Sequence, residues 1–344
     1  MEQDLRRRIG PGQGPLDRQL FAVKASEMVF PVAKRIGRSL LVVLLVTMGV
    51  VGLLSLAPGS VASVILGENA TPKAVAALNA ELGFDRPLWQ QYTDWLTGAV
   101  QGDLGDSPVT GQSVSAAIAE RLPVTLQLAV MAFVIALAVS ILLAVASAAR
   151  PGSPVDRGIN AVSSVFLSVP AFIAGPLLIY FCALKLGWFP VTGWARISEG
   201  IGPNLQAAML PAIAIALTEI ASFHRLLRTD LIGTLREDFV GAAKAKGMSA
   251  TYVMFRHALR PSSFSLITLA GINLGRLIGG TVIVESLFSL PGLGQLLASS
   301  ITARDVITVQ GVVAFIAVVY VGVNTAVDLS YRMIDPRVKK AARA

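Results

Sequence analysis

The sequence predicts an all-α polytopic membrane protein with six transmembrane helices. Its mean hydropathy is +0.66, and only 15% of its residues are charged, whereas a soluble domain carries about a quarter. Backbone groups in hydrocarbon must bond within their own segment, so apolar runs of about 20 residues indicate spanning helices. Six runs approach or exceed this length: Leu40–Ala57, Val124–Ala149, Ile159–Leu184, Leu205–Ile220, Ser262–Val284 and Val306–Val327.

The basic residues predict which side of the membrane each loop occupies. Outside the runs, 22 Lys and Arg residues lie in the two terminal segments and in loops 150–158 and 225–261, against 6 in the other loops. The positive-inside rule therefore places both termini in the cytoplasm. We expect a multi-pass protein of the inner membrane, in contact with lipid. The same asymmetry accounts for the net charge of +8, so we expect no nucleic-acid partner.

The two ends of the chain are expected to be cytoplasmic tails, residues 1–35 and 339–344. The first is rich in Arg, Gly, Pro and Gln. Residues 36–57 follow almost forty mostly polar residues, which is too late for a cleaved signal peptide, so they predict the first transmembrane helix.

Residues 58–123 form the largest predicted external region, with two short helices. Thr71 precedes a proline in the pattern of a helix start, and Gly83 ends that helix. A second helix begins near Pro87 and ends before Gly102. Seven acidic residues against three basic ones make the region acidic.

Two compatible interpretations of this external region stay open. It is either a small cap packed on the helix bundle or a docking platform for an external partner. Aromatic side chains of its second helix are the docking candidates: Trp89, Tyr92 and Trp95.

Residues 124–338 contain the other five predicted spans. Pro170 and Pro176 break the third span. The external loop 289–305 predicts a short helix, which serves either as an ordinary capped connection or as an outer lid.

The sequence contains no motif for the common kinds of catalysis. It has no G-x-x-x-x-G-K-[ST] phosphate loop, no H-E-x-x-H zinc motif and no G-x-S-x-G nucleophile turn. The two histidines lie far apart in sequence, and there is one cysteine. We therefore expect neither an enzyme nor a metal site, and no cofactor bound by this chain.

The cytoplasmic loop 227–261, between the fourth and fifth runs, carries the most informative pattern. Charged residues lead into a short helical stretch that ends at Gly247, and Ser249 can cap a second helix that runs to Pro261. We expect a stiff pair of short helices. The small residues Gly241–Ala243 would let another protein approach closely.

This loop resembles the EAA loop of ABC-importer permeases, whose pattern is E-A-A, three residues, Gly, nine residues and I-x-L-P. Gly241-Ala242-Ala243, Gly247 and His257–Arg260 take the corresponding places, with Gly for Glu, His for Ile and Arg for Pro. Further stretches are similar to the dipeptide/oligopeptide permease family of the DppB/OppB type: ELGFDRPLWQQYTDWLTGAVQGDLG, ERLPVTLQL, LGRLIGGTVIVESLFSLPGLGQLL and DLSYRMIDPRV. The likeness covers roughly residues 35–339.

The resemblance implies a type I ABC-importer permease fold and a multi-subunit complex. A coupling helix over Thr234–Lys246 would sit in a groove of a separate ATPase subunit. The complex would contain a second homologous permease subunit, two ATPase subunits or domains that bind ATP and Mg, and an extracytoplasmic substrate-binding protein docked on residues 58–123. The coupling residues would be Glu237, Asp238, Phe239, Gly241, Ala242, Ala243, Lys244, Lys246 and Gly247.

The fifth run contains Gly271, Gly275 and Gly279, which lie on one helix face and permit close packing. This face would contact the partner permease near the pore, or it would make a tight contact within the chain. Arg276 must face protein or water. Whether it lines the pore is left open. Glu285, at the end of the run, is a candidate external gate contact.

The function predicted is that of a permease subunit forming half of the translocation path for di- or oligopeptides. A permease for nickel, glutathione or another small solute is the alternative. A secondary transporter driven by an ion gradient is disfavoured. Such proteins show inverted repeats and broken helices with ion ligands, whereas this sequence shows no repeat and few carboxylates within its apolar runs.

Overall fold

The computed structural model describes residues 37–38, 40–56 and 59–334; the predicted tails 1–35 and 339–344 lie outside these ranges. The chain divides into two units, Met1–Gly49 and Val50–Ala344. In the first, residues 40–49 are helical and carry exposed Leu40, Leu41 and Leu45, as a lipid-facing helix would.

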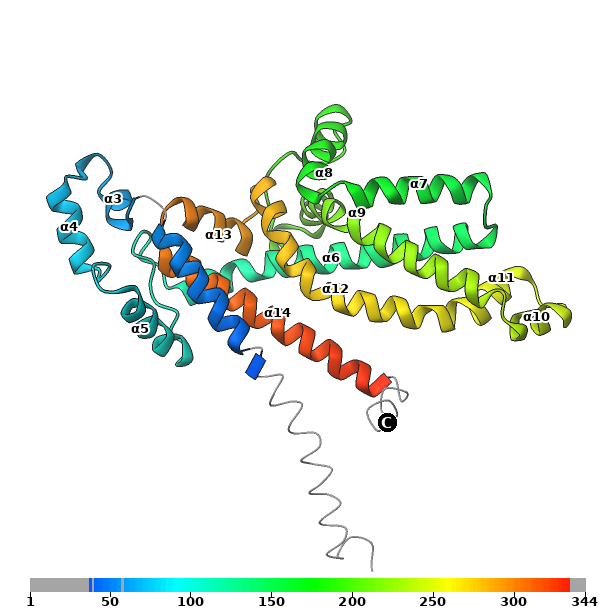
Figure 1. The fold of residues 1–344 in the computed structure, drawn as a ribbon. Coiled ribbons are helices and arrows are strands. Elements are labelled where there is room, and N and C mark those ends of the chain that lie inside the picture. Colours follow the sequence, from blue (N-terminus) through cyan, green and yellow to red (C-terminus); the bar gives the residue numbers. More distant parts are fainter. Residues whose placement is uncertain (1–36, 39, 57–58, 335–344) are drawn as a thin grey trace, which may run out of the picture. The chain divides into compact units, whose positions relative to one another are not determined.

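The second unit is built of helices (Figure 1), and its described residues form no strand beyond one isolated bridge. Three of its helices are long and apolar enough to cross a membrane: α6 (Val114–Ala149), α9 (Ile201–Thr234) and α14 (Val306–Ile334). Three bent pairs of helices add one span each if each pair is counted as a single span. The chain therefore has three to six spans, and the six predicted are its upper limit.

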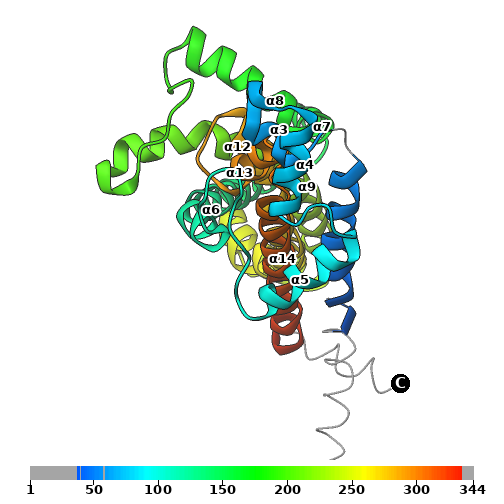
Figure 2. The same cartoon turned by 90° about the vertical axis from the view of Figure 1, so that its left-hand side faces the viewer.

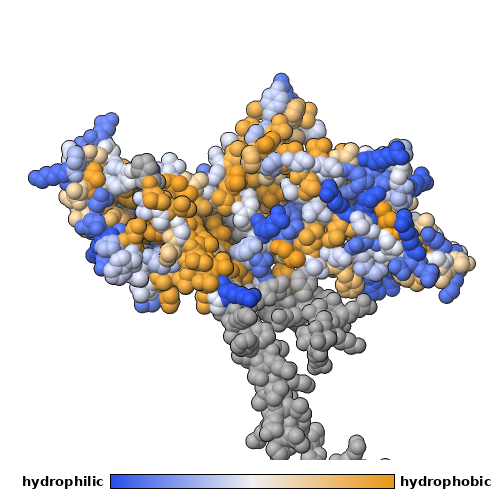
Figure 3. Space-filling model, in the orientation of Figure 1, coloured by the Kyte–Doolittle hydropathy of each residue, from blue (hydrophilic) through white to orange (hydrophobic). Residues whose placement is uncertain are grey.

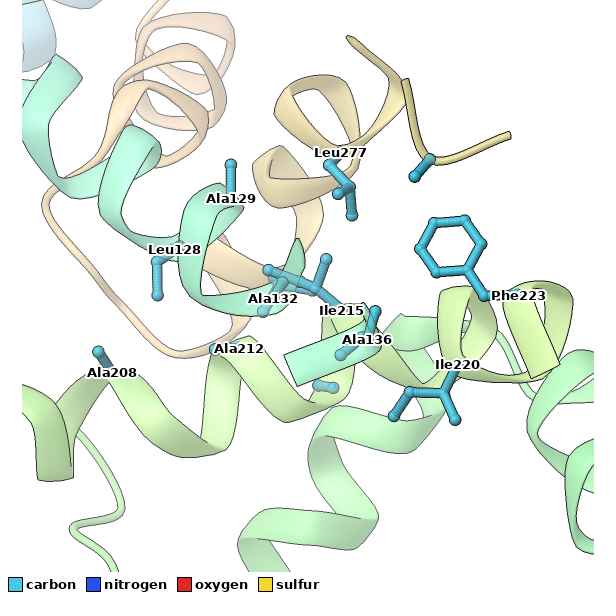
Figure 4. Packing of buried hydrophobic residues seen from close by; sticks show 14 of the residues in the cluster. Leu128, Ala129, Ala132, Ala136, Ala208, Ala212, Ile215, Ile220, Phe223 and Leu277 are labelled. Carbon is cyan, nitrogen blue, oxygen red and sulfur yellow. The ribbon is translucent and has the colours of Figure 1, made fainter. Parts of the chain in front are cut away.

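The centre of the bundle is the contact between α6 and α9. Small residues recur at intervals of three or four along both helices, and they are fully or almost fully buried: Ala129, Ala132 and Ala136 on α6, and Ala208, Ala212 and Ala216 on α9. Figure 4 shows the side chains of Ala132 and Ala136 beside those of Ala212 and Ile215. Small side chains allow two helix backbones to approach closely, which is the main source of packing energy inside a membrane.

The third apolar run is not one straight helix. It forms α7 (Pro154–Ser168) and α8 (Ala171–Leu178), which continues as a wide turn over Ile179–Lys185, and the two arms meet at 109°. Val169 is extended, with φ −100° and ψ 109°, because the residue before a proline avoids the helical region. The predicted break at Pro170 is confirmed, whereas the one at Pro176 is wrong, since Pro176 lies inside α8.

The predicted external region contains α3 (Val61–Leu66), α4 (Pro72–Glu81) and α5 (Leu88–Val100), which lie towards the viewer in Figure 2. The Thr71 hydroxyl accepts the Ala74 N–H at 3.3 Å, as predicted for a helix start. The loop 289–305 forms α13 (Leu293–Thr302), whose Leu293 and Leu296 are buried against the start of α6 and against α14. This predicted external loop is therefore largely a packed helix.

The surface separates by polarity, as a membrane protein requires. Hydrophobic residues gather over the middle of the bundle in Figure 3, and hydrophilic residues cover the end where α10 (Asp238–Ala245) lies. That end carries the predicted coupling loop.

Candidate functional site

The connection between α9 and α12 (Leu259–Leu287) is shorter than the predicted loop 227–261. Residues 227–234 of the predicted loop belong to α9, where Leu227 and Leu231 are buried. The segment outside the long helices is therefore 235–258. The predicted helix Thr234–Lys246 begins too early. The chain turns at 235–237, and α10 covers Asp238–Ala245 only. We call residues 235–258 the coupling segment.

Gly247 ends α10 as the sequence predicts. Its φ is +78°, a left-handed conformation in which glycine carries no steric penalty. The Ser249 hydroxyl then accepts the Tyr252 N–H at 3.3 Å, which confirms the predicted helix start.

The predicted second short helix is wrong as an independent element. The chain forms α11 (Ala250–Tyr252) and one wide π-helical turn (Val253–Ala258), and it passes directly into α12. In a regular α-helix the ring of Pro261 would clash with the carbonyl four residues earlier, at His257. His257 lies inside the wide turn, where the regular α-helical arrangement that would produce this clash is absent. The segment thus holds one free short helix, tied by Gly247 to the extended start of α12.

A small apolar core fixes α10 to this extension. Val240 and Ala243 are buried against Val253, and Leu235 packs beside them. Ala243 was predicted to belong to the surface that meets an ATPase; instead it faces inward. The other predicted coupling residues are exposed: Glu237, Asp238, Phe239, Gly241, Ala242, Lys244, Lys246 and Gly247. Phe239, with 48% of its surface exposed, is the largest apolar group on that outer side.

A buried ion pair holds the same end of the bundle together. Arg228 of α9 donates to Asp156 of α7 through both Nε and Nη2, each at 2.7 Å. Asp156 also accepts from Ser147 of α6, from Asn160 and from the Gly152 N–H at 2.7 Å. Three helices are therefore joined at one carboxylate. The sequence analysis missed this cluster. A single Asp in the otherwise basic loop 150–158 could have indicated a buried ion pair.

The glycines of the fifth run do not share one environment. A Cβ on Gly275 would lie 3.1 Å from Asn324 Oδ1 and 3.3 Å from Tyr320 Cδ2, so Gly275 packs against α14 of its own chain. Gly279 and Gly280 have no neighbour within 4 Å of a Cβ. Gly271 is half-buried. For Gly275 the intrachain alternative is the correct one; for Gly279 the partner interface stays a prediction.

Arg276 is exposed and lies near a buried polar pair. Its Nη1 is 3.5 Å from Asn273 Oδ1, and Asn273 Nδ2 donates to Glu219 Oε2 at 2.7 Å. The charge thus faces away from the packed interior, as expected. Its role in the pore stays a prediction.

Glu285 is completely buried, so it is not an exposed gate contact as the sequence suggested. Its carboxylate accepts the Gly294 N–H at 2.6 Å, at the start of α13. The neighbouring Leu293 N–H donates to Thr125 of α6 at 2.9 Å. These two acceptors satisfy N–H groups that the first turn of a helix leaves unpaired, and they fasten α13 to α12 and α6.

The three aromatic docking candidates differ in accessibility. Trp89 is 66% exposed. Trp95 is half-buried and donates through Nε1 to the Leu104 carbonyl at 3.2 Å, with Tyr92 beside it at 6.1 Å between ring centroids. Trp89 is therefore the accessible member of the set, and docking through it stays a prediction. Among the described residues, no cluster of three His, Cys, Asp or Glu side chains could hold a metal ion.

Comparison with known protein families shows to which family the chain belongs. The model described as "Binding-protein-dependent transport system inner membrane component" matches residues 136–340, and its N-terminal companion matches residues 28–129. The chain belongs to this family.

Individual relatives agree over nearly the whole chain. The chain is 35% identical over 308 residues to the probable peptide ABC transporter permease protein y4tP of Sinorhizobium fredii, covering 90% of this chain and 98% of that one. It is 33% identical over 329 residues to the di/tripeptide transport system permease protein DppB of Pseudomonas aeruginosa, with the same coverage.

A solved amino acid ABC transporter structure with histidines matches with a TM-score of 0.50 at 18% identity, covering 64% of this chain and 94% of that one, which bears on the fold alone. The resemblance to DppB/OppB-type permeases is confirmed, and so is the all-α permease fold. This permease is a multi-pass inner-membrane component without an ATPase site of its own, and its family works with ATPase, substrate-binding and second permease partners in general.

Proposed function

We propose that this permease forms half of the translocation path of an ATP-driven importer for short peptides. The observation that carries the proposal is the coupling segment: a short helix with an exposed outer face, fixed by its own apolar core to two long helices. Such an element transmits a pull from an ATPase to both helices, because it moves with them as one body.

The proposed ATPase contact consists of the exposed residues around α10. Phe239 would enter an apolar groove, and Gly241 and Ala242 would allow the groove walls to approach. Lys246 would meet acidic groups of the ATPase. ATP and Mg would be bound by two ATPase partners, and this chain would contribute no ligand to them. The second permease subunit would be homologous to this one.

Peptide cargo is supported by the names of the relatives and by the chemistry of the external end. A cavity of about 480 Å³ there is lined by groups of both charges and by an aromatic ring, among them Glu120, Arg121, Arg196 and Trp194. A peptide carries both charges at its termini and a polar backbone between them, so this lining suits it. Nickel complexes and glutathione are the alternative cargoes. The acidic region 58–123 would receive the binding protein, with Trp89 as one contact.

Reconstitution into liposomes tests the proposal. The permease is co-expressed with the subunits that co-purify with it, and uptake of a labelled dipeptide is measured with and without internal ATP. We expect uptake that requires ATP and the binding protein and that persists when ion gradients are dissipated. Uptake driven by an ion gradient without ATP would refute the proposal, whereas ATP-dependent uptake of a different cargo would refute only the peptide assignment.

A further inference from the structure

A cavity of about 410 Å³ lies between the coupling segment and the ends of α6 and α9. Its walls are mostly apolar. Val145 and Ala148 come from the last turns of α6, Ile232 from α9, and Val253, Met254 and Phe255 from the wide turn before α12. The coupling segment and the bundle thus share one hollow, and anything that fills it contacts both.

Two cations line this hollow, Arg236 and Lys244. Both side chains are exposed, and neither makes an ion pair with another described residue. No carboxylate lines the cavity; Glu237 and Asp238 are exposed neighbours along the chain and do not contribute to its walls. The site therefore combines apolar walls with two uncompensated positive charges.

The hollow lies beside the end of α6. The apolar part of α6 ends at Ala149, and the next residue is the exposed Arg150. Phe255 is 54% exposed and Tyr252 is 51% exposed beside the cavity, and exposed aromatic rings are enriched at the membrane–water interface. A basic residue after an apolar helix and exposed aromatic rings beside it are typical of the depth at which lipid headgroups lie.

We propose that this cavity binds an anionic phospholipid. The phosphate would lie between Arg236 and Lys244, and the glycerol and the first methylenes would cover the apolar walls. A soluble anion would leave those walls wet, and a neutral apolar solute would leave both cations unpaired. A zwitterionic lipid would bring a further cation to a site that already has two. Only an anionic lipid satisfies both halves of the site.

Such a lipid would link the coupling segment to α6 and α9, so the coupling of the permease would depend on the lipid composition of that leaflet. This inference does not depend on the cargo.

Lipid retention tests it directly. The full chain, with its co-purifying subunits, is placed in nanodiscs of phosphatidylcholine with a minor fraction of phosphatidylglycerol, and bound lipids are counted by native mass spectrometry after transfer to detergent. We expect one retained phosphatidylglycerol per permease. Its affinity should fall about thirtyfold in the double variant Arg236→Gln, Lys244→Gln, from the loss of two cations near the bilayer surface.

The matched control is the double variant Lys246→Gln, Arg256→Gln, which removes two exposed cations of the same segment that do not line the cavity. We expect it to retain the lipid. A third variant, Thr251→Trp, fills the cavity without changing charge and should exclude the lipid while the permease elutes as wild type on size exclusion.

Equal retention by all variants would overturn the proposal, as would equal loss in the test and control pairs, which would indicate surface charge alone. Competition by inorganic phosphate as strong as by phosphatidylglycerol would also overturn it, because the site would then be an anion site. So would loss of the ATPase subunits from the test variant with lipid retention unchanged, since the cavity would then belong to that interface.

Discussion

The buried carboxylates of this permease join helices to one another. Glu285 is completely buried and caps α13, and Asp156 is almost completely buried and holds Arg228. A buried charge is costly unless it is paired or strongly hydrogen-bonded, so each of these groups fixes a unique arrangement of its neighbours. The polar chemistry at these two sites therefore serves the rigidity that a moving transporter needs in its parts.

Replacing Glu285 by Ala should destabilise the external end. The variant leaves the Gly294 N–H buried without its acceptor, and such a loss costs about 1–3 kcal/mol. Thermal unfolding in detergent, followed by tryptophan fluorescence, measures it. Glu81→Ala, at an exposed position of α4, is the control and should melt as wild type does. If both variants melt with the wild type, Glu285 does not cap α13.

Gly294→Ala should have a larger effect than Glu285→Ala. A Cβ at Gly294 would lie 2.6 Å from the Val282 carbonyl oxygen, which is backbone and cannot move aside without shifting α12. Gly111→Ala is a partial control, since Gly111 has open space but a φ of +68°. Folded yield in detergent separates the two. Equal yields would show that α12 and α13 do not approach so closely.

Arg228→Lys should weaken the junction of α6, α7 and α9. Lysine is a single-point donor and cannot reproduce the two parallel bonds to Asp156, whereas breaking a buried pair altogether costs about 3–5 kcal/mol. We expect Asp156→Ala to be the more damaging change, because it leaves the arginine unpaired. Arg225→Lys, at an exposed position one turn earlier, should be neutral. A double-mutant cycle on unfolding energies gives the coupling between the two residues, and a coupling near zero would contradict the junction.

At the scale of elements, sequence patterns predicted the ends of the short helices well and the contacts between helices poorly. Thr71, Gly83, Gly247 and Ser249 act locally, and the structure places each at the end or start predicted. The inward turn of Ala243 depends on Val253, ten residues away, which no local pattern reveals. The wide turn before Pro261 was missed because proline was expected to end a helix, whereas the chain accommodates it.

The two faces of α10 should respond differently to the same substitution. Ala242→Trp places a large ring on the exposed side, so the permease should fold and insert while ATP-driven uptake falls at least about tenfold. Ala243→Trp must enter the small core with Val240 and Val253, so we expect it to destabilise the segment itself, as overpacking does by about 1–3 kcal/mol. Limited proteolysis within 235–258, read together with uptake, distinguishes these outcomes. Similar protease sensitivity of both variants would contradict the inward position of Ala243.

Gly275 and Gly279 form a second matched pair, on α12. Gly275→Leu should separate α12 from α14, because even a Cβ would press on Tyr320 and Asn324. A Cβ at Gly279 would have no described atom within 4 Å, so the isolated chain should tolerate Gly279→Leu. If Gly279 instead faces the second permease, the same variant should fold yet fail to assemble. Unfolding of the single chain and co-purification of the complex report on these two effects separately, and equal stability of both variants would contradict the α12–α14 contact.

For the whole molecule, composition alone predicted the class, since an apolar chain of this length has only lipid to solvate its helices. The number of spans was harder, because Pro170 splits one run into arms at 109° and hydropathy does not record direction. The predicted coupling segment was approximately correct in position, whereas the cavity beneath it was unforeseen. It is formed by the end of α6 together with α9 and the coupling segment, and its lining residues extend from Val145 to Phe255 along the chain.

Charge asymmetry predicts the orientation of the whole permease. With 22 basic residues on one side and 6 on the other, the positive-inside rule puts the C-terminus and α10 in the cytoplasm and α5 outside. A fluorescent protein fused after Ala344 should therefore fluoresce, because it folds in the cytoplasm. Alkaline phosphatase inserted at Gly111, an exposed turn position, should be active, because it needs the oxidising external side. The exchanged fusions, with phosphatase after Ala344 and fluorescent protein at Gly111, are the controls and should both be silent. If the controls were active and the first pair silent, the permease would lie inverted, and α10 could not reach an ATPase.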